Sequence, residues 1–314
     1  MVREPDAVLE AAPTQLGGGV ASVGPSRARG GVTGLRARFA GLRISAVTIV
    51  ACAVMLIIAF SAIFAEQVAP YDPLAGNYSA IRKAPSVEHW LGTDDVGRDV
   101  LSRLIYGARI SLAVGFGAVL LGDLVGMVWG VASGYIGRRF DLLSQRLLEV
   151  VLAFPGLILA TMLMLVLGAG IQTVIIAIAV TRVPACTRVI RAVALSTKEM
   201  LYVEAARVSG ASSFRIMLRH IAPACIAPFL VIFSAHLGIA ITTEAALSFV
   251  GVGVPPPSPS WGTMLSGAAV GKFNPLWWLA VFPGLAITLT VLSINLAGDS
   301  LRDFLDPQLR RRAD

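Results

Sequence analysis

Six long apolar segments run through this sequence and limit what the chain can fold into. They cover approximately residues 44–65, 110–134, 147–168, 171–194, 225–250 and 276–295. Each is long enough for a helix to cross a hydrocarbon layer roughly 30 Å thick. Charged residues make up only 14% of the chain, whereas a soluble domain carries about 25%. The sequence therefore excludes an ordinary cytosolic enzyme and predicts an all-α integral membrane protein with six transmembrane helices.

The first apolar segment differs from a secretory signal peptide in two respects. Its apolar core is longer than that of a signal, and residues 1–43 precede it. We therefore expect a retained membrane anchor. Residues 1–43 are rich in Gly, Ser and Ala and lack apolar periodicity, so they are predicted to form a disordered cytoplasmic tail. The sequence leaves open whether this tail also binds a partner.

Basic residues are distributed unevenly between the two sides of the predicted spans. Most of the 26 lysines and arginines fall in residues 1–43, in the second loop, in the fourth loop with the ends of its flanking helices, and in residues 301–314. In this count Arg182 belongs to the fourth-loop group. The other side holds Arg82, Lys83, Arg98, Arg103, Arg109 and Lys272. Because positive charge marks the cytoplasmic side, both termini are predicted to be cytoplasmic, and the net charge of +7 indicates topology rather than nucleic-acid binding.

A polar stretch over about residues 196–223 separates the fourth and fifth spans and contains signals for two short helices. Ser196 and Glu199 have the spacing of a capping box that would start the first helix. Gly210 suits the end of that helix, since a C-terminal cap needs positive φ. Ser212 or Ser213 would cap the second helix, which Pro223 would end.

The second of these helices carries an apolar stripe at i, i+3 and i+4 with basic residues on another side. The stripe is Phe214, Met217 and Leu218, and the basic residues are Arg215 and Arg219. Such a helix can dock on a soluble partner. Periodicity alone leaves open a second interpretation, an interfacial helix whose apolar side rests on lipid headgroups.

The motif Glu204-Ala205-Ala206, followed by Gly210 and then by Ile221-x-Pro223, resembles the EAA loop of ABC-importer permeases. The resemblance implies that this loop is cytoplasmic and docks on an ATPase subunit. A rigid helix pair joined at Gly210 can transmit a rigid-body movement to the flanking spans. The implied coupling residues are Glu204, Ala205, Ala206, Gly210, Phe214, Arg215, Met217 and Leu218.

Three more stretches resemble the C-subunit type of the dipeptide, oligopeptide and nickel permease family. They are "HWLGTDDVGRDVLSRLIYGARISL" (residues 89–112), "SFVGVGVPPPSPSWGTML" (248–265) and "GDSLRDFLDPQLR" (298–310). The resemblance covers nearly everything from about Ile44 onward. Two positions depart from the family pattern: Ala222 stands where Leu is usual, and Arg138 stands where a second glycine is usual. These departures affect the strength of docking rather than the assignment.

The resemblance implies the transmembrane domain of a type I ABC importer. The expected organisation is a tail over 1–43, a first helix and extracytoplasmic loop over 44–109, a permease core over 110–300 with the EAA loop at about 196–223, and a cytoplasmic tail over 301–314. The chain would form half of a translocation pathway for dipeptides or oligopeptides in the bacterial inner membrane. A nickel importer, or an importer of another small solute such as haem or a metal chelate, is the alternative.

The same resemblance implies a set of partners and leaves the chain without chemistry of its own. The expected partners are a second homologous permease subunit, two cytoplasmic ATPase subunits that bind ATP and Mg, an extracytoplasmic substrate-binding protein and membrane lipid, with no nucleic acid. We expect no cofactor, no metal and no catalytic residue in this chain. A membrane enzyme would need acid/base or metal clusters, which the sequence does not show, and a structural scaffold would leave the EAA motif unexplained.

Motifs that would indicate other activities are weak. "GAAVGKF" (residues 267–273) is one residue short of a phosphate loop and has Phe273 where a Ser or Thr would bind magnesium. The histidines (His89, His220 and His236) are too dispersed for a metal cluster, and the cysteines (Cys52, Cys186 and Cys225) show no metal spacing.

Several polar residues fall inside predicted spans, where they are costly unless they face a cavity or a partner. His236 and Thr243 share a helix face, with Glu244 beside it, so these three are candidates for the translocation path. Hydrogen bonding between helices or subunits is the alternative. Asp123 and Glu149 also lie within spans.

Two further features each allow two interpretations. Gly122 and Gly126 form a G-x-x-x-G pair suited to close helix contact, either at a dimer interface or within the subunit. The mixed charges of the first external loop form either a landing surface for the binding protein or a self-contained cap held by local pairs; they are Asp94, Asp95, Arg98, Asp99 and Arg103.

Overall fold

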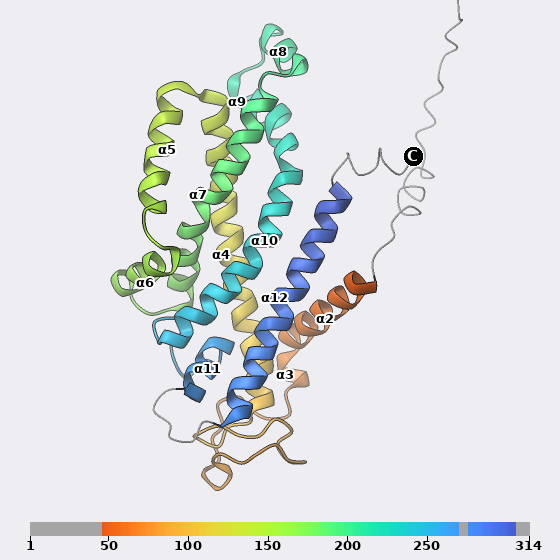
Figure 1. Cartoon of the computed structure of the whole chain (residues 1–314), viewed down its shortest axis with the longest axis vertical. Helices are drawn as coiled ribbons and strands as arrows, with labels where there is room; N and C mark the ends of the chain where they lie inside the picture. Colours follow the sequence, from red (N-terminus) through yellow and green to blue (C-terminus); the bar gives the residue numbers. More distant parts are fainter. Residues whose placement is uncertain (1–45, 270–275, 306–314) are drawn as a thin grey trace, which may run out of the picture. The chain divides into compact units, whose positions relative to one another are not determined.

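The computed structural model describes residues 46–269 and 276–305 (Figure 1), and within these residues the only β pairing is an isolated bridge between Thr93 and Asp99. The predicted tail over 1–43, part of "GAAVGKF" and residues 306–314 lie outside the described residues. The elements in chain order are α2 (Ala46–Ile63), α3 (Ala65–Val68), the 3-10 turn η1 (Tyr78–Ala80), α4 (Val100–Ile136), α5 (Arg138–Leu152), α6 (Gly156–Leu167), α7 (Ile171–Thr197), α8 (Leu201–Val208), α9 (Ser213–Ile216), the π-helical turn η2 (Met217–Ile221), α10 (Ala222–Val250), α11 (Trp261–Ala269) and α12 (Trp277–Leu305).

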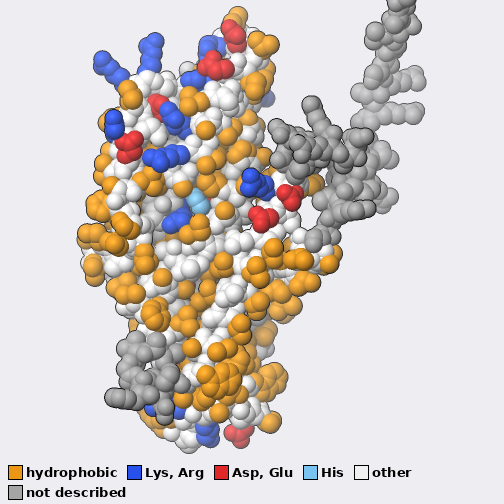
Figure 2. Space-filling model, viewed as in Figure 1, with side chains coloured by type: hydrophobic (Ala, Val, Ile, Leu, Met, Phe, Trp, Pro, Cys, Tyr) orange, Lys and Arg blue, Asp and Glu red, His pale blue; other side chains and the backbone are white. Residues whose placement is uncertain are grey.

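Among the described residues, five helical stretches are long and apolar enough to cross a membrane. They are α2, α4, α7, the continuous run Ser213–Val250 and α12, and a sixth is reached only if α5 and α6 together make one span. On the face drawn in Figure 2, charged side chains lie in the upper half and at the lower tip, and the band between them shows hydrophobic side chains and no charged ones. The all-α membrane fold expected from the apolar segments is confirmed.

The expected single helix over residues 147–168 is wrong. This segment is divided between α5 and α6, whose axes differ by 87° across a break at residues 153–155. Pro155 explains the break, because it lacks an N–H and disfavours helical backbone at Phe154. Only twelve residues remain in α6, which is shorter than the roughly 20 residues that a straight span requires.

The pair α4 and α7 forms the centre of the bundle. Glycines repeat every four residues along the side of α4 that faces α7, at Gly122, Gly126, Gly130 and Gly134, and a Cβ added at any of them would lie within 3.0 Å of an atom of α7. Small residues at this spacing let two helix backbones approach closely. The G-x-x-x-G pair is therefore part of packing within this subunit, which the sequence could not separate from a dimer interface.

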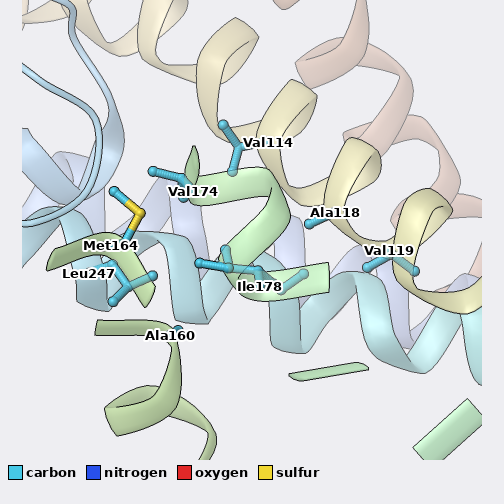
Figure 3. Packing of buried hydrophobic residues seen from close by; sticks show 10 residues of the cluster. Val114, Ala118, Val119, Ala160, Met164, Val174, Ile178 and Leu247 are labelled. Carbon is cyan, nitrogen blue, oxygen red and sulfur yellow. The ribbon is translucent and has the colours of Figure 1, made fainter. Parts of the chain in front are cut away.

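The remaining helices pack around this pair. Helix α10 contacts α4, α7 and α12, and α2 lies against α12 and α4. A buried cluster joins α4, α6, α7 and α10 and includes Val114, Val119, Met164, Ile178 and Leu247 (Figure 3). The bundle has two ends, which α4 connects. The start of α4 meets residues 69–99, where Tyr71 N donates to Ser102 Oγ at 3.0 Å, and its last turn reaches the end that carries α8, called here the α8 end.

Candidate functional site

The α8 end carries a helical hairpin formed by α8 and α9. Helix α8 stops at Val208, and Gly210 takes φ of +79°, the left-handed conformation that favours glycine. The hydroxyl of Ser212 then accepts a hydrogen bond from Arg215 N and caps α9. The predicted turn at Gly210 and cap at Ser212 are both present in the structure.

Two other expectations for this hairpin are wrong. Ser196 does not begin a new helix, because α7 continues to Thr197 and the Ser196 hydroxyl donates back to Val193 O at 2.9 Å; α8 starts at Leu201 without a side-chain cap. Pro223 does not end the second helix either. The π-helical turn η2 precedes it, and α10 follows directly, since the wider turn makes room for a proline ring that lacks an N–H.

One side of the hairpin is fixed to the spans. Val203 of α8, Ile216 of α9 and Ile221 of η2 are buried in a cluster with side chains of α4, α7 and α10, among them Val131, Ile190, Ala194 and Cys225. Because apolar packing of this kind resists separation, the hairpin is held firmly on α7 and α10.

The other side of the hairpin is apolar, and no described residue covers it. Leu201 is 82% exposed, Val208 83% and Phe214 68%, and Tyr202 and Leu218 are also exposed. We call these five residues the hairpin patch. Single exposed apolar residues are common on proteins, whereas several on one small element indicate a surface that another molecule covers.

The structure divides the predicted coupling residues between these two sides. Ala206 and Met217 pack partly against the buried cluster, so they anchor the hairpin. The remaining predicted residues are exposed: Glu204, Ala205, Gly210, Phe214, Arg215 and Leu218. The stripe of Phe214, Met217 and Leu218 is therefore split, with Met217 turned inward.

The three candidates for the translocation path occupy different surroundings. His236 is buried, and its Nδ1 lies 2.7 Å from Oδ1 of Asp123 on α4. Thr243 is half-buried and its hydroxyl donates to Ile239 O in its own helix. Interhelical hydrogen bonding is thus what the structure shows for His236 and Asp123, and a role in the path stays a prediction for all three candidates.

Glu244 belongs to a separate buried polar group at the far end of α10 from the hairpin. Its Oε1 accepts a hydrogen bond from Ser248 Oγ at 2.8 Å, and Ser248 Oγ in turn accepts one from Val254 N. The hydroxyls of Ser111 and Ser260 lie near the same carboxylate. This arrangement holds the segment between α10 and α11 on α4 and α10.

Residues 69–99 and the start of α4 are tied together by local pairs. Asp99 Oδ2 accepts hydrogen bonds from Ser102 N and Oγ at 2.8 Å and caps α4. The guanidinium of Arg103 is buried, donates to Pro73 O and lies 3.6 Å from Asp94. This part of the loop therefore forms a self-contained cap held by local pairs. Its use as a landing surface for a binding protein stays a prediction.

Sequence reasoning missed Arg182. It was grouped with the fourth loop, but the structure places it inside α7, close to Asp123 of α4 and to Gly156 at the start of α6. The signal was present, since Arg182 falls inside the predicted span over residues 171–194, but the count of basic residues grouped it with the fourth loop and the ends of its flanking helices.

Comparison with known proteins identifies the family. Residues 126–311 match the family described as binding-protein-dependent transport system inner membrane component. The chain is similar to a putative peptide transport system permease protein of Brucella suis, with 41% identity over 256 residues, 82% of this chain and 86% of that protein. It is also similar to the glutathione transport system permease protein GsiD of Pectobacterium atrosepticum, with 42% identity over 260 residues, 82% of this chain and 85% of the relative.

A solved structure shares the fold. The inward-facing MetNI methionine ABC transporter contains a chain that superposes with a TM-score of 0.53 at 18% identity, covering 65% of this chain and 96% of that one. Together with the family match over more than half of the sequence and the relatives above 40% identity, these findings confirm the resemblance seen in the motifs: the chain belongs to the inner membrane components of binding-protein-dependent transport systems and is a permease subunit of the ABC-importer type.

Proposed function

We propose that this chain forms half of the translocation pathway of an ATP-driven importer of small peptides, and that the hairpin patch docks on a separate ATPase subunit. ATP and Mg would be bound by that subunit. The proposed assembly contains a second permease, two ATPase subunits and an extracytoplasmic substrate-binding protein, which are the components that membership of the family implies.

The observation that carries the docking proposal is the two-sided hairpin. Val203 and Ile216 fix one side on the spans, while Leu201, Val208 and Phe214 present apolar surface outward. An exposed apolar patch of this kind is stabilised by burial against a partner, at roughly 25 cal/mol per Å² of apolar area. Charged groups at its edge, Glu204 and Arg215, add complementarity to a partner of matching charge.

The continuity of the helices favours a mechanical role for this contact. Only residues 198–200 separate α8 from α7, and α9 leads through η2 directly into α10. Both α7 and α10 pack on α4. A displacement of the hairpin would therefore move two spans as rigid bodies, which is one of the established ways in which proteins switch between states.

The proposal places the α8 end in the cytoplasm. Exposed basic side chains gather there, from α5, α8, α9 and η2: Arg138, Arg139, Arg207, Arg215 and Arg219. On the face drawn in Figure 2, blue side chains gather around the α5 and α8 end of the molecule. Lysine and arginine flanking spans favour the cytoplasmic side, which would also put both termini there.

The names of the relatives support peptide-like cargo. One relative is named for peptide transport and another for glutathione transport, and glutathione is itself a small peptide. We therefore infer that the cargo of this chain is a short peptide. Within the assembly this subunit supplies a passage, and the binding protein is expected to supply most of the selectivity.

The test is transport by the complete complex reconstituted in vesicles. Glu204→Lys reverses a charge on the exposed side of α8, and Glu199→Lys makes the same change on an exposed residue just outside α8. We expect Glu204→Lys to abolish ATP-driven peptide uptake and to weaken ATPase copurification, with normal membrane insertion, while Glu199→Lys retains both. Full uptake by Glu204→Lys would refute the coupling role, and uptake of nickel but no peptide by the unmodified complex would refute the cargo.

A further inference from the structure

Arg182 lies in the middle of a helix long enough to cross a membrane. Along the axis it is about 17 Å from Ile171 and about 22 Å from Thr197, at a rise of 1.5 Å per residue. Half of the hydrocarbon layer is about 15 Å thick, so a guanidinium at this depth is remote from lipid headgroups. An arginine within a span is costly unless it faces a cavity or a group of opposite charge.

Most donors of this guanidinium have no acceptor in the described part of the chain. The Nε group donates to Thr181 Oγ1 at 3.1 Å, and both Nη groups remain without a hydrogen bond within residues 46–269 and 276–305. No carboxylate of those residues forms an ion pair with Arg182 at 4.0 Å or less. The side chain is only half-buried, so its outer edge is accessible to another molecule.

Asp123 compensates part of the charge without using these donors. It is near enough to attract the guanidinium, but its Oδ1 is taken by His236, and its Oδ2 is buried without a hydrogen-bond partner among the described residues. The Asp123 side chain is fully buried, whereas part of Arg182 is exposed. Arg182 therefore has the buried Asp123 side chain on one side and an exposed edge on the other.

The guanidinium lies beside the break between α5 and α6. A Cβ built on Gly156 would lie 3.7 Å from Nη2 of Arg182, so the first residue of α6 lies near the guanidinium and, as a glycine, places no side chain in front of it. The first N–H groups of a helix have no intrahelical partner, and broken helices in transporters direct such ends toward anionic cargo. Here the start of α6 adds positive potential to a site that rests on Arg182.

The geometry points to an anion site at Arg182 that accepts the carboxylate of a peptide during its passage. This inference rests on the proposed function and adds which group of the cargo is recognised and by which residue. A carboxylate matches the paired donors of a guanidinium, and every peptide with a free C-terminus carries one. A lipid phosphate does not reach this depth.

The test compares an alanine tripeptide that has a free C-terminal carboxylate with the same tripeptide as a C-terminal amide, in the reconstituted complete complex. For Arg182→Gln we expect uptake of the free acid to fall about tenfold, the loss expected for one charged hydrogen bond, with uptake of the amide unchanged. Arg182→Lys should restore part of the uptake. Arg188→Gln, which removes an exposed cation from the same helix, should affect neither peptide.

A second measurement uses only the free-acid peptide. Its result therefore does not depend on whether the binding protein also delivers the amide. A photoreactive residue in place of Leu157, which is exposed in the first turn of α6, should crosslink to labelled free-acid peptide during turnover, and Arg182→Gln should abolish this capture while Arg188→Gln preserves it. Capture that is absent, or equal in both variants, overturns the site.

The uptake assay separates this inference from the function on which it rests. Equal losses for acid and amide in Arg182→Gln overturn the carboxylate site and assign Arg182 to an acidic group of the partner subunit or to the fold, while peptide import by the unmodified complex still stands. An unmodified complex that imports neither peptide overturns the proposed function and the site together.

Discussion

Nδ1 of His236 on α10 lies 2.7 Å from Oδ1 of Asp123 on α4, and both side chains are buried. The two helices are thus joined by a polar contact inside a bundle whose other contacts are mostly apolar. Hydrogen bonds to charged groups contribute more than neutral ones, and a buried group left without its partner costs its desolvation. This pair therefore fixes the position of α10 on α4.

Replacing His236 by Ala should lower the free energy of unfolding by about 1–3 kcal/mol, because the Asp123 carboxylate would lose its hydrogen bond. Thermal unfolding of the purified protein in detergent measures this change. Asp123→Ala should also destabilise, and the double variant should lose less than the sum of the two, since neither group is then left alone. Strictly additive losses would show that the two side chains do not stabilise each other.

Gly130 allows the close approach of α4 to α7. A Cβ at this position would lie 2.8 Å from both Ile190 Cβ and Thr187 O, so Gly130→Ala should separate the helices and cost about 1–3 kcal/mol, the usual effect of overpacking. An added Cβ at Gly284 of α12 has no atom of the described residues within 4 Å, and Gly284→Ala should leave stability unchanged or raise it. Equal melting temperatures for the two variants would contradict this packing.

Gly210 joins the two helices of the hairpin in a conformation that proline cannot adopt. Its φ is +79°, whereas proline is locked near −65°, so Gly210→Pro should abolish ATP-driven uptake while the chain still inserts in the membrane. Asn tolerates positive φ, and Gly210→Asn should retain most of the uptake. Both variants are compared by transport per amount of complex, and unchanged transport by Gly210→Pro would show that the turn is not needed for coupling.

Glu244 holds the segment that follows α10 through Ser248. Removing the carboxyl group in Glu244→Ala should speed hydrogen exchange of the amides in residues 251–260 by about tenfold, since one buried hydrogen bond is lost. Glu244→Gln keeps an acceptor for the Ser248 hydroxyl and should exchange nearly as slowly as the unmodified chain. Exchange that is the same in all three proteins would exclude this role for Glu244.

Most of the fold could be predicted from composition because lipid cannot satisfy backbone polar groups, so an apolar segment of about 20 residues has few alternatives to a helix. The helices α2, α4, α7, α10 and α12 all cover segments predicted in this way. The bend between α5 and α6 was not predicted, although Pro155 marks it, because prolines also occur inside continuous helices of this chain, at Pro184, Pro228 and Pro283.

The hairpin shows where a local pattern was sufficient and where it was not. The turn at Gly210 and the cap at Ser212 depend on neighbouring residues only, and both were predicted. The capping box at Ser196 was wrong because packing of Ala194 and Thr197 in the bundle keeps α7 helical past that point. The division of the apolar stripe into an anchored Met217 and an exposed Phe214 depends on what α4 and α7 place beneath the hairpin.

The sequence by itself determined that the chain spans a membrane, which family it resembles, and that a helical hairpin turns at Gly210, because these depend on composition, order and local backbone chemistry. Only the tertiary structure decided that Gly122 and Gly126 pack inside the subunit and that His236 contacts Asp123. It also decided that Arg182 of α7 lies half-buried beside the start of α6. The reason is physical: these relationships join residues from different helices, and the distances between helices depend on how all of their side chains pack together.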